Sequence, residues 1–246
     1  MKAIILAAGR GCRMGNMTAE QPKCMTQFAG KALVKWQLDA LTGAGVREIG
    51  IVRGYLADKL LLPDIKTFYN ERWAATNMVM SLACADIWLK NEPCIVSYSD
   101  IVYGSSCVQM LIDVDCDLAI TYDPNWLKLW QVRFANPLSD AETFKTDNDG
   151  YLVEIGSKAS CVDEIKGQYM GLLRFTPTGW GMVEQYLEEL LPDQRDKLDM
   201  TSLLRALISR SAKIKAVPIA SQWFEVDNEN DLNAYKLIIE TNGLAL

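Results

Sequence analysis

Short apolar runs alternate along the chain with segments in which apolar residues recur every three or four positions, the spacing of a helix face. The apolar runs of the first half lie at residues 3–6, 48–52, 66–69, 93–100 and 117–121. Helical periodicity covers residues 31–45 and the later part of 70–90. This alternation predicts an α/β fold with a single Rossmann-like, mostly parallel sheet that is flanked by helices on both faces.

The rhythm changes between residues 122 and 175. Residues 143–145 and 151–155 surround the turn sequence Asp147-Asn-Asp-Gly150, which predicts a hairpin, and 169–175 is a further strand. The remaining expected elements are helices at 178–191, 200–210 and 228–239 and strands at 213–218 and 222–227. Because no stretch has the composition of a linker, we expect one domain over 1–246 with a small β-rich insertion at about 122–175.

A loop of small residues follows the first apolar run, within the stretch KAIILAAGRGCRMGNMTAEQPK from Lys2 to Lys23. Its small residues are Ala7, Ala8, Gly9, Gly11 and Gly15. Side chains this small let the backbone approach a ligand, and glycine permits a positive φ where a turn needs one. Arg13 lies inside the loop and Lys23 just after it. A strand, a small-residue loop and fixed positive charge together indicate a polyphosphate site.

Three other interpretations of this loop fit less well. The Walker pattern needs Gly-Lys-Ser/Thr after four spacers, whereas Lys23 follows Pro22. The dinucleotide pattern G-x-G-x-x-G is met at Gly9 and Gly11, but Met14 occupies the third glycine position. A tight turn without a ligand does not select an arginine and a lysine.

Composition narrows the chemistry. The chain has no histidine, which excludes Ser-His-Asp and Cys-His catalysis and the usual zinc sites, and leaves carboxylates, cations and an oxygen-ligated metal such as Mg²⁺. The formal net charge of the chain is −6, but residues 1–36 carry six cations against Glu20, a net of +5. Cations concentrated at the first loop of an acidic protein favour an anionic small ligand over nucleic acid.

The sequence also predicts a cytoplasmic protein. No apolar run reaches the roughly 18–20 residues of a membrane span. The first residues resemble a weak signal peptide, but their apolar run is short and leads directly into the glycine loop. The seven cysteines contain no C-x-x-C pair, which favours a reducing compartment.

Two aspartates close apolar strands, Asp100 after the run that begins at residue 93 and Asp227 at the end of 222–227. Because ligands of open parallel sheets bind at the carboxyl ends of strands, Asp100 is expected at the same edge as the glycine loop. Helix capping is the alternative for both, for a helix that begins near Gly104 and for the helix after Asp227. Asn77, near the start of another helix, is also a candidate cap.

The stretch from Leu6 to Lys23 closely resembles the LAAGxGxRM…PK loop of the nucleotidyltransferase superfamily, which makes nucleotide-sugars and CDP-alcohols. The resemblance implies that the loop wraps a nucleoside triphosphate, that Arg13 and Lys23 are the catalytic cations on its phosphates, and that Asp100 and Asp227 bind magnesium. The nucleotide-binding residues that it implies are Leu6, Ala7, Ala8, Gly9, Gly11, Cys12, Arg13, Gly54, Asn77, Ser81 and Ser99.

Within that superfamily the chain resembles bacterial phosphocholine and phosphonate cytidylyltransferases over residues 1–120 and 199–235, and more loosely between. The candidate acceptor-binding residues are Trp126, Trp130, Arg133, Lys158, Tyr169 and Asp199. Aromatic walls suit a quaternary ammonium, whereas a guanidinium at Arg133 is wrong for choline and right for a carboxylate or phosphate. Lys158 lies near where sugar nucleotidyltransferases place a substrate-phosphate lysine, and Asp199 suits an ammonium. In the alternative, the aromatic residues belong to the core and Arg133 is a surface cation.

The resemblance implies a Mg²⁺-dependent cytidylyltransferase that transfers CMP from CTP to a small zwitterionic phosphate or phosphonate and releases pyrophosphate. Phosphocholine, aminoethylphosphonate and a phospho-amino acid such as phosphoglutamine are the expected acceptors, and the preference for cytosine rests on the resemblance alone. The alternatives are a sugar-1-phosphate nucleotidyltransferase and a non-catalytic nucleotide-binding regulatory module. A monomer or homodimer that binds neither nucleic acid nor membrane is expected.

Overall fold

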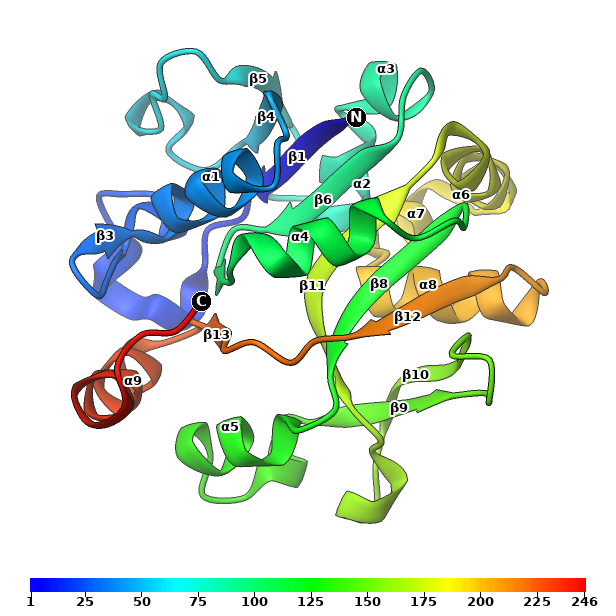
Figure 1. Ribbon diagram of the computed structural model, residues 1–246. Coiled ribbons are helices and arrows are strands. Elements are labelled where there is room, and N and C mark those ends of the chain that lie inside the picture. The colour runs from blue at the N-terminus through cyan, green and yellow to red at the C-terminus, as the bar shows by residue number, and fades with distance from the viewer.

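A seven-stranded sheet forms the centre of the molecule, in the order β12-β8-β11-β6-β1-β4-β5 (Figure 1). This computed structural model describes residues 1–246, except for the side chain of Asn242. The strands are β1 (Lys2–Ala7), β4 (Glu48–Arg53), β5 (Lys66–Tyr69), β6 (Cys94–Tyr98), β8 (Leu118–Asp123), β11 (Gln168–Phe175) and β12 (Ile214–Pro218). All neighbouring pairs are parallel except those of β11, which runs antiparallel to both β6 and β8. The predicted mostly parallel α/β fold is confirmed.

Both faces of the sheet are covered by helices. Along β1, Ala3 and Ile5 pack into one apolar cluster, whereas Ile4 and Leu6 pack into the other, as expected when successive side chains point to opposite faces. The helices α1 (Leu33–Gly43) and α4 (Ser105–Ile112) contribute to the first cluster. The helices of the second are α2 (Met78–Ala83), α6 (Pro177–Glu189) and α8 (Met200–Ser209). The short helices α3 (Asp86–Leu89) and α7 (Pro192–Lys197) follow α2 and α6 in the chain.

The loop after β1 leads into two 3-10 turns, η1 (Cys12–Thr18) and η2 (Lys23–Met25). Gly11 has φ of +65°, and a Cβ at this position would lie 2.9 Å from Cδ of Lys23. A larger residue would therefore be strained and would displace the Lys23 side chain. The strands β2 (Gln27–Phe28) and β3 (Lys31–Ala32) then pair with each other before α1 begins, and η3 (Ala57–Lys59) follows β4.

A small second sheet joins two distant parts of the chain. After β6, the chain bends at Ser99 and Asp100 and enters β7 (Ile101–Val102), which pairs antiparallel with β13 (Phe224–Glu225). The expected strand at 222–227 is thus only two residues long and lies outside the main sheet, because its partner is β7. The backbone N–H of Val226 also donates to the carbonyl of Asp100, at 2.9 Å. This pairing fixes the backbone of Asp100 beside the segment that carries Asp227, before α9 (Glu229–Asn242) begins.

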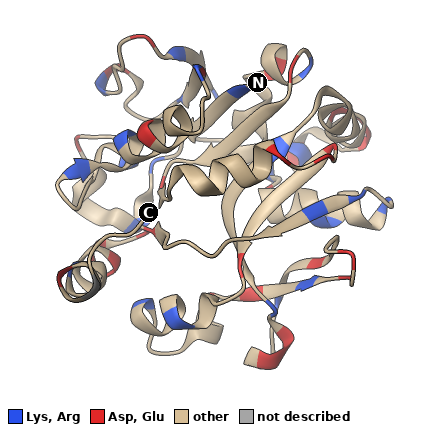
Figure 2. Cartoon of the chain, in the orientation of Figure 1, with Lys and Arg blue, Asp and Glu red and all other residues tan. Residues whose placement is uncertain are grey.

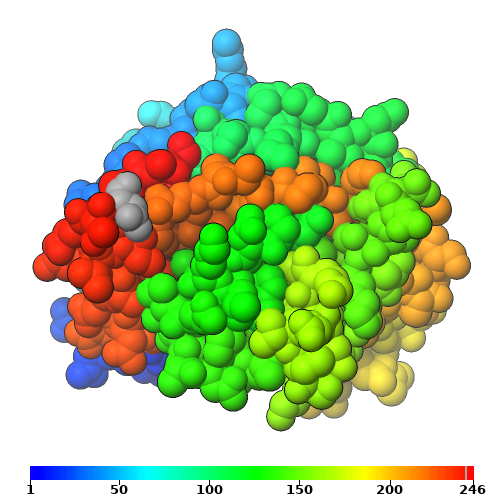
Figure 3. Space-filling model, turned by 60° about the horizontal axis from the view of Figure 1, so that its bottom comes forward, coloured from blue at the N-terminus to red at the C-terminus, as the bar shows by residue number. Residues whose placement is uncertain are grey.

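The segment at 122–175 contains more helix than its pattern predicted. The hairpin is present as β9 (Glu142–Thr146) and β10 (Leu152–Lys158). A helix, α5 (Trp126–Arg133), and two 3-10 turns, η4 (Pro137–Ser139) and η5 (Val162–Glu164), accompany it. The strand β11 belongs to the central sheet. Figure 3 shows this segment, in green, beside the red C-terminal helix α9, which α5 contacts.

Charged residues of both signs are interspersed over the helices, strands and loops (Figure 2). In the part of the chain that the structure describes, no helix combines the length and apolarity that crossing a membrane requires. Arg13 and Lys23 form ion pairs with Asp100 and Asp227 near the carboxyl edge of the sheet, where β1 and β6 end.

Candidate active site

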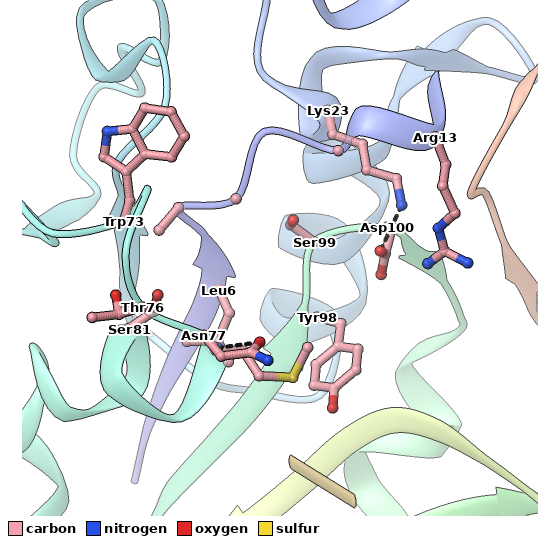
Figure 4. Close-up of a pocket in the computed structure, with 14 residues that line it drawn as sticks. Leu6, Arg13, Lys23, Trp73, Thr76, Asn77, Ser81, Tyr98, Ser99 and Asp100 are labelled. Carbon is pink, nitrogen blue, oxygen red and sulfur yellow. Dashed lines mark hydrogen bonds and ion pairs between the residues drawn. The ribbon is translucent and has the colours of Figure 1, made fainter. Parts of the chain in front are cut away.

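A cavity of about 220 Å³ opens at this sheet edge (Figure 4). Its wall is formed by the loop after β1, the end of β6 and the segment that leads into α2. The lining residues are Leu6, Ala8, Gly9, Gly11, Arg13, Lys23, Trp73, Thr76, Asn77, Met78, Ser81, Tyr98, Ser99 and Asp100. Figure 4 shows Lys23 and Arg13 pointing toward Asp100 from one side, with Asn77 and Ser81 on the other.

Lys23 connects the two aspartates that the sequence placed at strand ends. Its Nζ lies 2.7 Å from Oδ2 of Asp100 and 2.8 Å from Oδ1 of Asp227, although the two acids are 127 positions apart in the chain. The Lys23 side chain is 9% exposed and that of Asp227 only 3%. Low exposure weakens solvent screening, so these ion pairs are stronger than pairs on the surface.

The protonation states of the pair follow from this geometry. Burial alone would lower the pKa of Lys23, but the attraction of Asp100 and Asp227 outweighs it and the pKa lies above its usual value. Burial alone would likewise raise the pKa of Asp227, but Lys23 and two neighbouring arginines hold it below its usual range. Both groups are therefore charged at neutral pH.

A second cluster of charges holds Asp227 from its other side. Arg133 donates from Nη2 to Oδ2 of Asp227 at 3.0 Å, from Nη1 to Glu225 at 2.5 Å and from Nε to Asp231 at 3.2 Å. Arg13 approaches Oδ1 of Asp227 at 2.8 Å. Burial, together with repulsion from Asp227, raises the pKa of Glu225 to about 7. Asp227 thus forms ion pairs with three cations and accepts hydrogen bonds from two of them, Lys23 and Arg133.

The structure shows which of the three candidates, Asp100, Asp227 and Asn77, caps a helix. The helix α4 is capped at Gly104 and α9 at Asn228, so neither Asp100 nor Asp227 is an N-cap. Asn77 is the N-cap of α2, accepts from the backbone N–H of Met78 at 2.8 Å, and also lines the cavity.

The pair of acids fits a hard divalent cation. Oδ1 of Asp100 is buried and, among the described residues, has no hydrogen-bond partner. An unpaired buried carboxylate oxygen is costly, and Mg²⁺ prefers oxygen ligands. Across the described residues, no three Asp, Glu, Cys or His side chains form a metal-binding group. Mg²⁺ usually takes one or two carboxylates when substrate phosphates and water supply its other ligands, so two acids are enough.

Most of the expected nucleotide-binding residues line the cavity, but three take other positions. Ala7 is buried in the sheet core and Cys12 is exposed in the loop. Gly54 packs beneath the loop, where a Cβ would lie 2.7 Å from the carbonyl oxygen of Ala8 and 2.6 Å from Cβ of Trp73. Gly54 therefore permits close packing of two segments, which differs from the expected ligand contact.

Four cavity residues were not anticipated: Trp73, Thr76, Met78 and Tyr98. Trp73, Thr76 and Met78 lie on the segment between Asn70 and Ser81. Asn70 holds this segment in place, since its Nδ2 donates to Thr76 at 2.9 Å and to Ser81 at 3.0 Å. Tyr98 is the last residue of β6. The strand-end argument that selected Asp100 applies equally to Tyr98 and could have found it.

The two expected aromatic walls of the acceptor site are core residues. Trp126 and Trp130 are each 3% exposed and pack edge to face, with ring centroids 5.9 Å apart. Their indole N–H groups donate to the carbonyl of Ile165 and to Asp140. These residues and Arg133 are spaced i, i+4 and i+7 on α5, which places all three on its buried face. Burial leaves neither ring free to contact an acceptor.

Arg133, which the sequence suggested as a contact for an acceptor carboxylate or phosphate, pairs with acids of the protein itself. Its side chain is fully buried. Each of the three guanidinium nitrogens donates to one acid: Glu225, Asp227 or Asp231. Charge-assisted hydrogen bonds to three acids, two of them almost fully buried, hold the guanidinium in this position. Arg133 therefore supports Asp227, and direct binding of an acceptor carboxylate or phosphate is not compatible with this arrangement.

The other three acceptor candidates take separate positions. Tyr169 packs edge to face against Tyr98, with centroids 5.8 Å apart, so it lies directly behind the cavity wall. Burial raises the pKa of both tyrosines, which keeps their phenols neutral. Asp199 is the N-cap of α8 and accepts from the backbone N–H of Ser202 at 2.7 Å. Lys158 is exposed at the end of β10.

A family model and two curated relatives that match this chain are all nucleotidyltransferases. The model of the MobA-like NTP transferase domain matches residues 3–146. A CTP:phosphoglutamine cytidylyltransferase from Campylobacter jejuni is 44% identical over 248 aligned positions, which cover 94% of this chain and 98% of that protein. A choline-phosphate cytidylyltransferase from Streptococcus pneumoniae is 37% identical over 86 positions, covering 33% of this chain and 38% of that protein.

Solved structures share the fold. An inositol-1-phosphate CTP transferase from T. maritima superposes with a TM-score of 0.74 at 19% identity, covering 100% of this chain and 98% of that one. A CTP:phosphocholine cytidylyltransferase from Streptococcus pneumoniae superposes with a TM-score of 0.69 at 19% identity, covering 97% of this chain and 98% of that one.

Proposed function

Since this chain belongs to the MobA-like NTP transferase family and is an enzyme of the nucleotidyltransferase class, we propose that it transfers CMP from CTP to a small phosphorylated acceptor and releases pyrophosphate. The observation that carries this proposal is the ion pairing of Lys23 with both Asp100 and Asp227 beside the glycine loop. It places fixed charge of both signs where a metal–triphosphate complex would meet the sheet edge. As the chain is an enzyme, a silent regulatory module is not retained.

The reaction needs no general base. A phosphate oxygen of the acceptor, ionised at pH 7, attacks the α-phosphorus of CTP. The bond from the α-phosphorus to the bridging oxygen breaks, and its electron pair leaves with pyrophosphate. The obstacle is repulsion between two polyanions, because two unit charges ~4 Å apart interact by ~4 kcal/mol at an effective dielectric of ~20.

The residues of this chain would reduce the repulsion between the two polyanions by their positions and charges. The glycine loop would present backbone N–H groups to the triphosphate. Arg13 and Lys23 would neutralise charge on the leaving phosphates and on the acceptor, which is where catalysis by electrostatic preorganisation acts. Asp100 and Asp227 would hold Mg²⁺, and the ion would supply charge neutralisation on the phosphate oxygens. Asn77 and Ser81 lie on the far side of the cavity, which we assign to the nucleoside.

A phospho-amino acid, with phosphoglutamine first, is our proposed acceptor. The C. jejuni relative whose name gives that substrate matches almost the whole chain at 44% identity, whereas the choline-phosphate enzyme matches only a third of it. The burial of Trp126 and Trp130 also removes the aromatic walls that would favour choline. We further propose that residues 1–246 form one domain with the acceptor region at about 122–175, acting in the cytoplasm as a monomer or homodimer.

A pyrophosphate-release screen with Mg²⁺ tests the proposal. It crosses CTP, UTP, ATP and GTP with phosphoglutamine, phosphocholine, aminoethylphosphonate and glucose 1-phosphate. We expect the fastest release with CTP and phosphoglutamine. Asp100→Asn should abolish release, whereas Asp39→Asn, which alters an exposed aspartate paired with Lys31, should not change it. Fastest release with a sugar phosphate, or with a nucleotide other than CTP, would contradict the proposal.

A further inference from the structure

A glutamine lies in the middle of the buried face of α1. Gln37 has no exposed surface and is flanked on that face by Leu33, Val34, Ala40 and Leu41. Its Nε2 donates to the carbonyl of Tyr98 at 2.9 Å and to that of Ile101 at 2.8 Å. Its Oε1 is buried and has no partner among the described residues. An apolar side chain would avoid the unpaired Oε1, but it would take this donor away from the carbonyls of Tyr98 and Ile101, so the two donated bonds need an explanation.

The two carbonyls bracket the bend that carries Asp100. Tyr98 is the last residue of β6, and its pairing with β1 ends there, opposite Leu6. Ile101 is the first residue of β7, which leaves the main sheet to pair with β13. The backbone of this bend therefore lies outside the regular ladder of the central sheet. Gln37 reaches it from α1 and holds both of its ends with one amide group.

We propose that Gln37 is a positioning residue for Asp100: it fixes the Ser99–Asp100 bend so that the carboxylate faces Lys23 and the metal–triphosphate complex. The proposal rests on the proposed function of the same site. The bond from Val226 N–H to the carbonyl of Asp100 fixes the bend on the side of β13, and Gln37 fixes it on the side of α1. A site of this kind needs its charged groups held to within about 0.5 Å.

A positioning role predicts that loss of Gln37 changes the Mg²⁺ constant and kcat but not KM for CTP. Gln37 does not line the cavity, so its loss should change KM for CTP at saturating Mg²⁺ by no more than about two-fold. The Mg²⁺ concentration for half-maximal activity should rise, and kcat should fall, each by roughly 10- to 100-fold, as when a residue that orients a metal ligand is removed. A purely structural role would lower stability and the amount of active enzyme without moving the Mg²⁺ constant.

The test uses Gln37→Met, which keeps the side-chain length and removes both donors. The matched control is Trp180→Phe, which removes a buried donor that bonds to Asp86 at 2.6 Å, in a different part of the molecule. Two readouts are compared with the wild type: the Mg²⁺ and CTP constants, and hydrogen–deuterium exchange of the peptide that covers residues 97–102 in the ligand-free protein. Gln37→Met should raise that exchange and the Mg²⁺ constant, while Trp180→Phe should change neither.

Unchanged Mg²⁺ dependence and unchanged exchange of 97–102 in folded Gln37→Met would overturn the proposal. If that variant does not fold, Gln37→Asn, which keeps the amide but shortens it by one methylene, provides the decision: a Mg²⁺ constant within two-fold of the wild type would overturn the proposal, and a larger rise would support it. Failure of the proposed function looks different, because the wild type itself would then show no CTP-dependent release, while exchange of 97–102 would still report whether Gln37 holds the bend.

Discussion

The segment before residue 120 and the segment from 122 to 175 place their predicted site residues in opposite ways. In the first, Arg13, Lys23 and Asp100 lie together at the cavity. In the second, Trp126 and Trp130 lie in the core. Asp100 was selected by its place at the carboxyl end of a strand, and Arg13 and Lys23 by the motif of the loop that follows one, so topology fixes where these residues lie. The second was selected by residue type alone, and residue type does not tell which way a side chain points.

Arg133 joins the two segments physically. It comes from α5 and holds Asp227 through Oδ2, whereas Lys23, from the first segment, holds Oδ1 of the same carboxylate. One segment therefore supplies the groups at the cavity and the other supports one of them from behind. Substitutions on the two sides should differ in what they change, and the following predictions test that difference from the largest expected effect to the smallest.

Asp227→Asn should have the largest effect. Loss of this carboxylate removes one of the two acids paired with Lys23 and one of the three paired with Arg133, which costs about 3–5 kcal/mol of unfolding free energy. Pyrophosphate release should fall by about 10²–10³-fold or more, because the charge that we propose holds the metal is also removed. Steady-state release and chemical denaturation measure the two effects, with Asp39→Asn as the surface control. A variant with near wild-type turnover would remove Asp227 from the site.

Lys23→Met should separate catalysis from metal binding. Turnover should fall by about 10²-fold, because the cation that we propose neutralises the phosphates is lost. In the absence of nucleotide, however, Mn²⁺ should bind more tightly than to the wild type, because Lys23 no longer occupies oxygens of Asp100 and Asp227. Isothermal titration with Mn²⁺ measures this. Unchanged or weaker Mn²⁺ binding would show that lysine and metal do not share these oxygens.

Trp126→Phe should affect stability far more than acceptor binding. The loss of a buried indole hydrogen bond and of packing should cost about 1–3 kcal/mol, while KM for the acceptor stays within about two-fold. Denaturant unfolding and acceptor titration at saturating CTP give the two values. A ten-fold rise in acceptor KM with little loss of stability would return this residue to the acceptor site.

Tyr169→Phe should have the smallest effect. Its hydroxyl is buried and has no hydrogen-bond partner among the described residues, and its ring supports Tyr98 at the cavity wall. Because this hydroxyl is buried behind the cavity wall, the variant should leave KM for the acceptor and KM for CTP within about two-fold of the wild type. A ten-fold rise in acceptor KM alone would show instead that the acceptor reaches this hydroxyl.

Much of this could be predicted from the sequence, and the remainder failed for identifiable reasons. The strand–helix alternation gave the sheet, and the loop from Leu6 to Lys23 gave the cavity edge. The helix α5 was missed, although the spacing of Trp126, Trp130 and Arg133 is that of one helix face. Contacts such as those of Gln37 with the bend depend on tertiary packing, and no local pattern encodes them.

The central claim is that Asp100 and Asp227 hold one metal ion together with CTP. The most direct test counts Mn²⁺ bound by the protein–CTP complex, by electron paramagnetic resonance, in the wild type, Asp100→Asn and Asp227→Asn. The account predicts that each single variant loses the same protein-dependent Mn²⁺ signal. Full retention of that signal in either variant would contradict it.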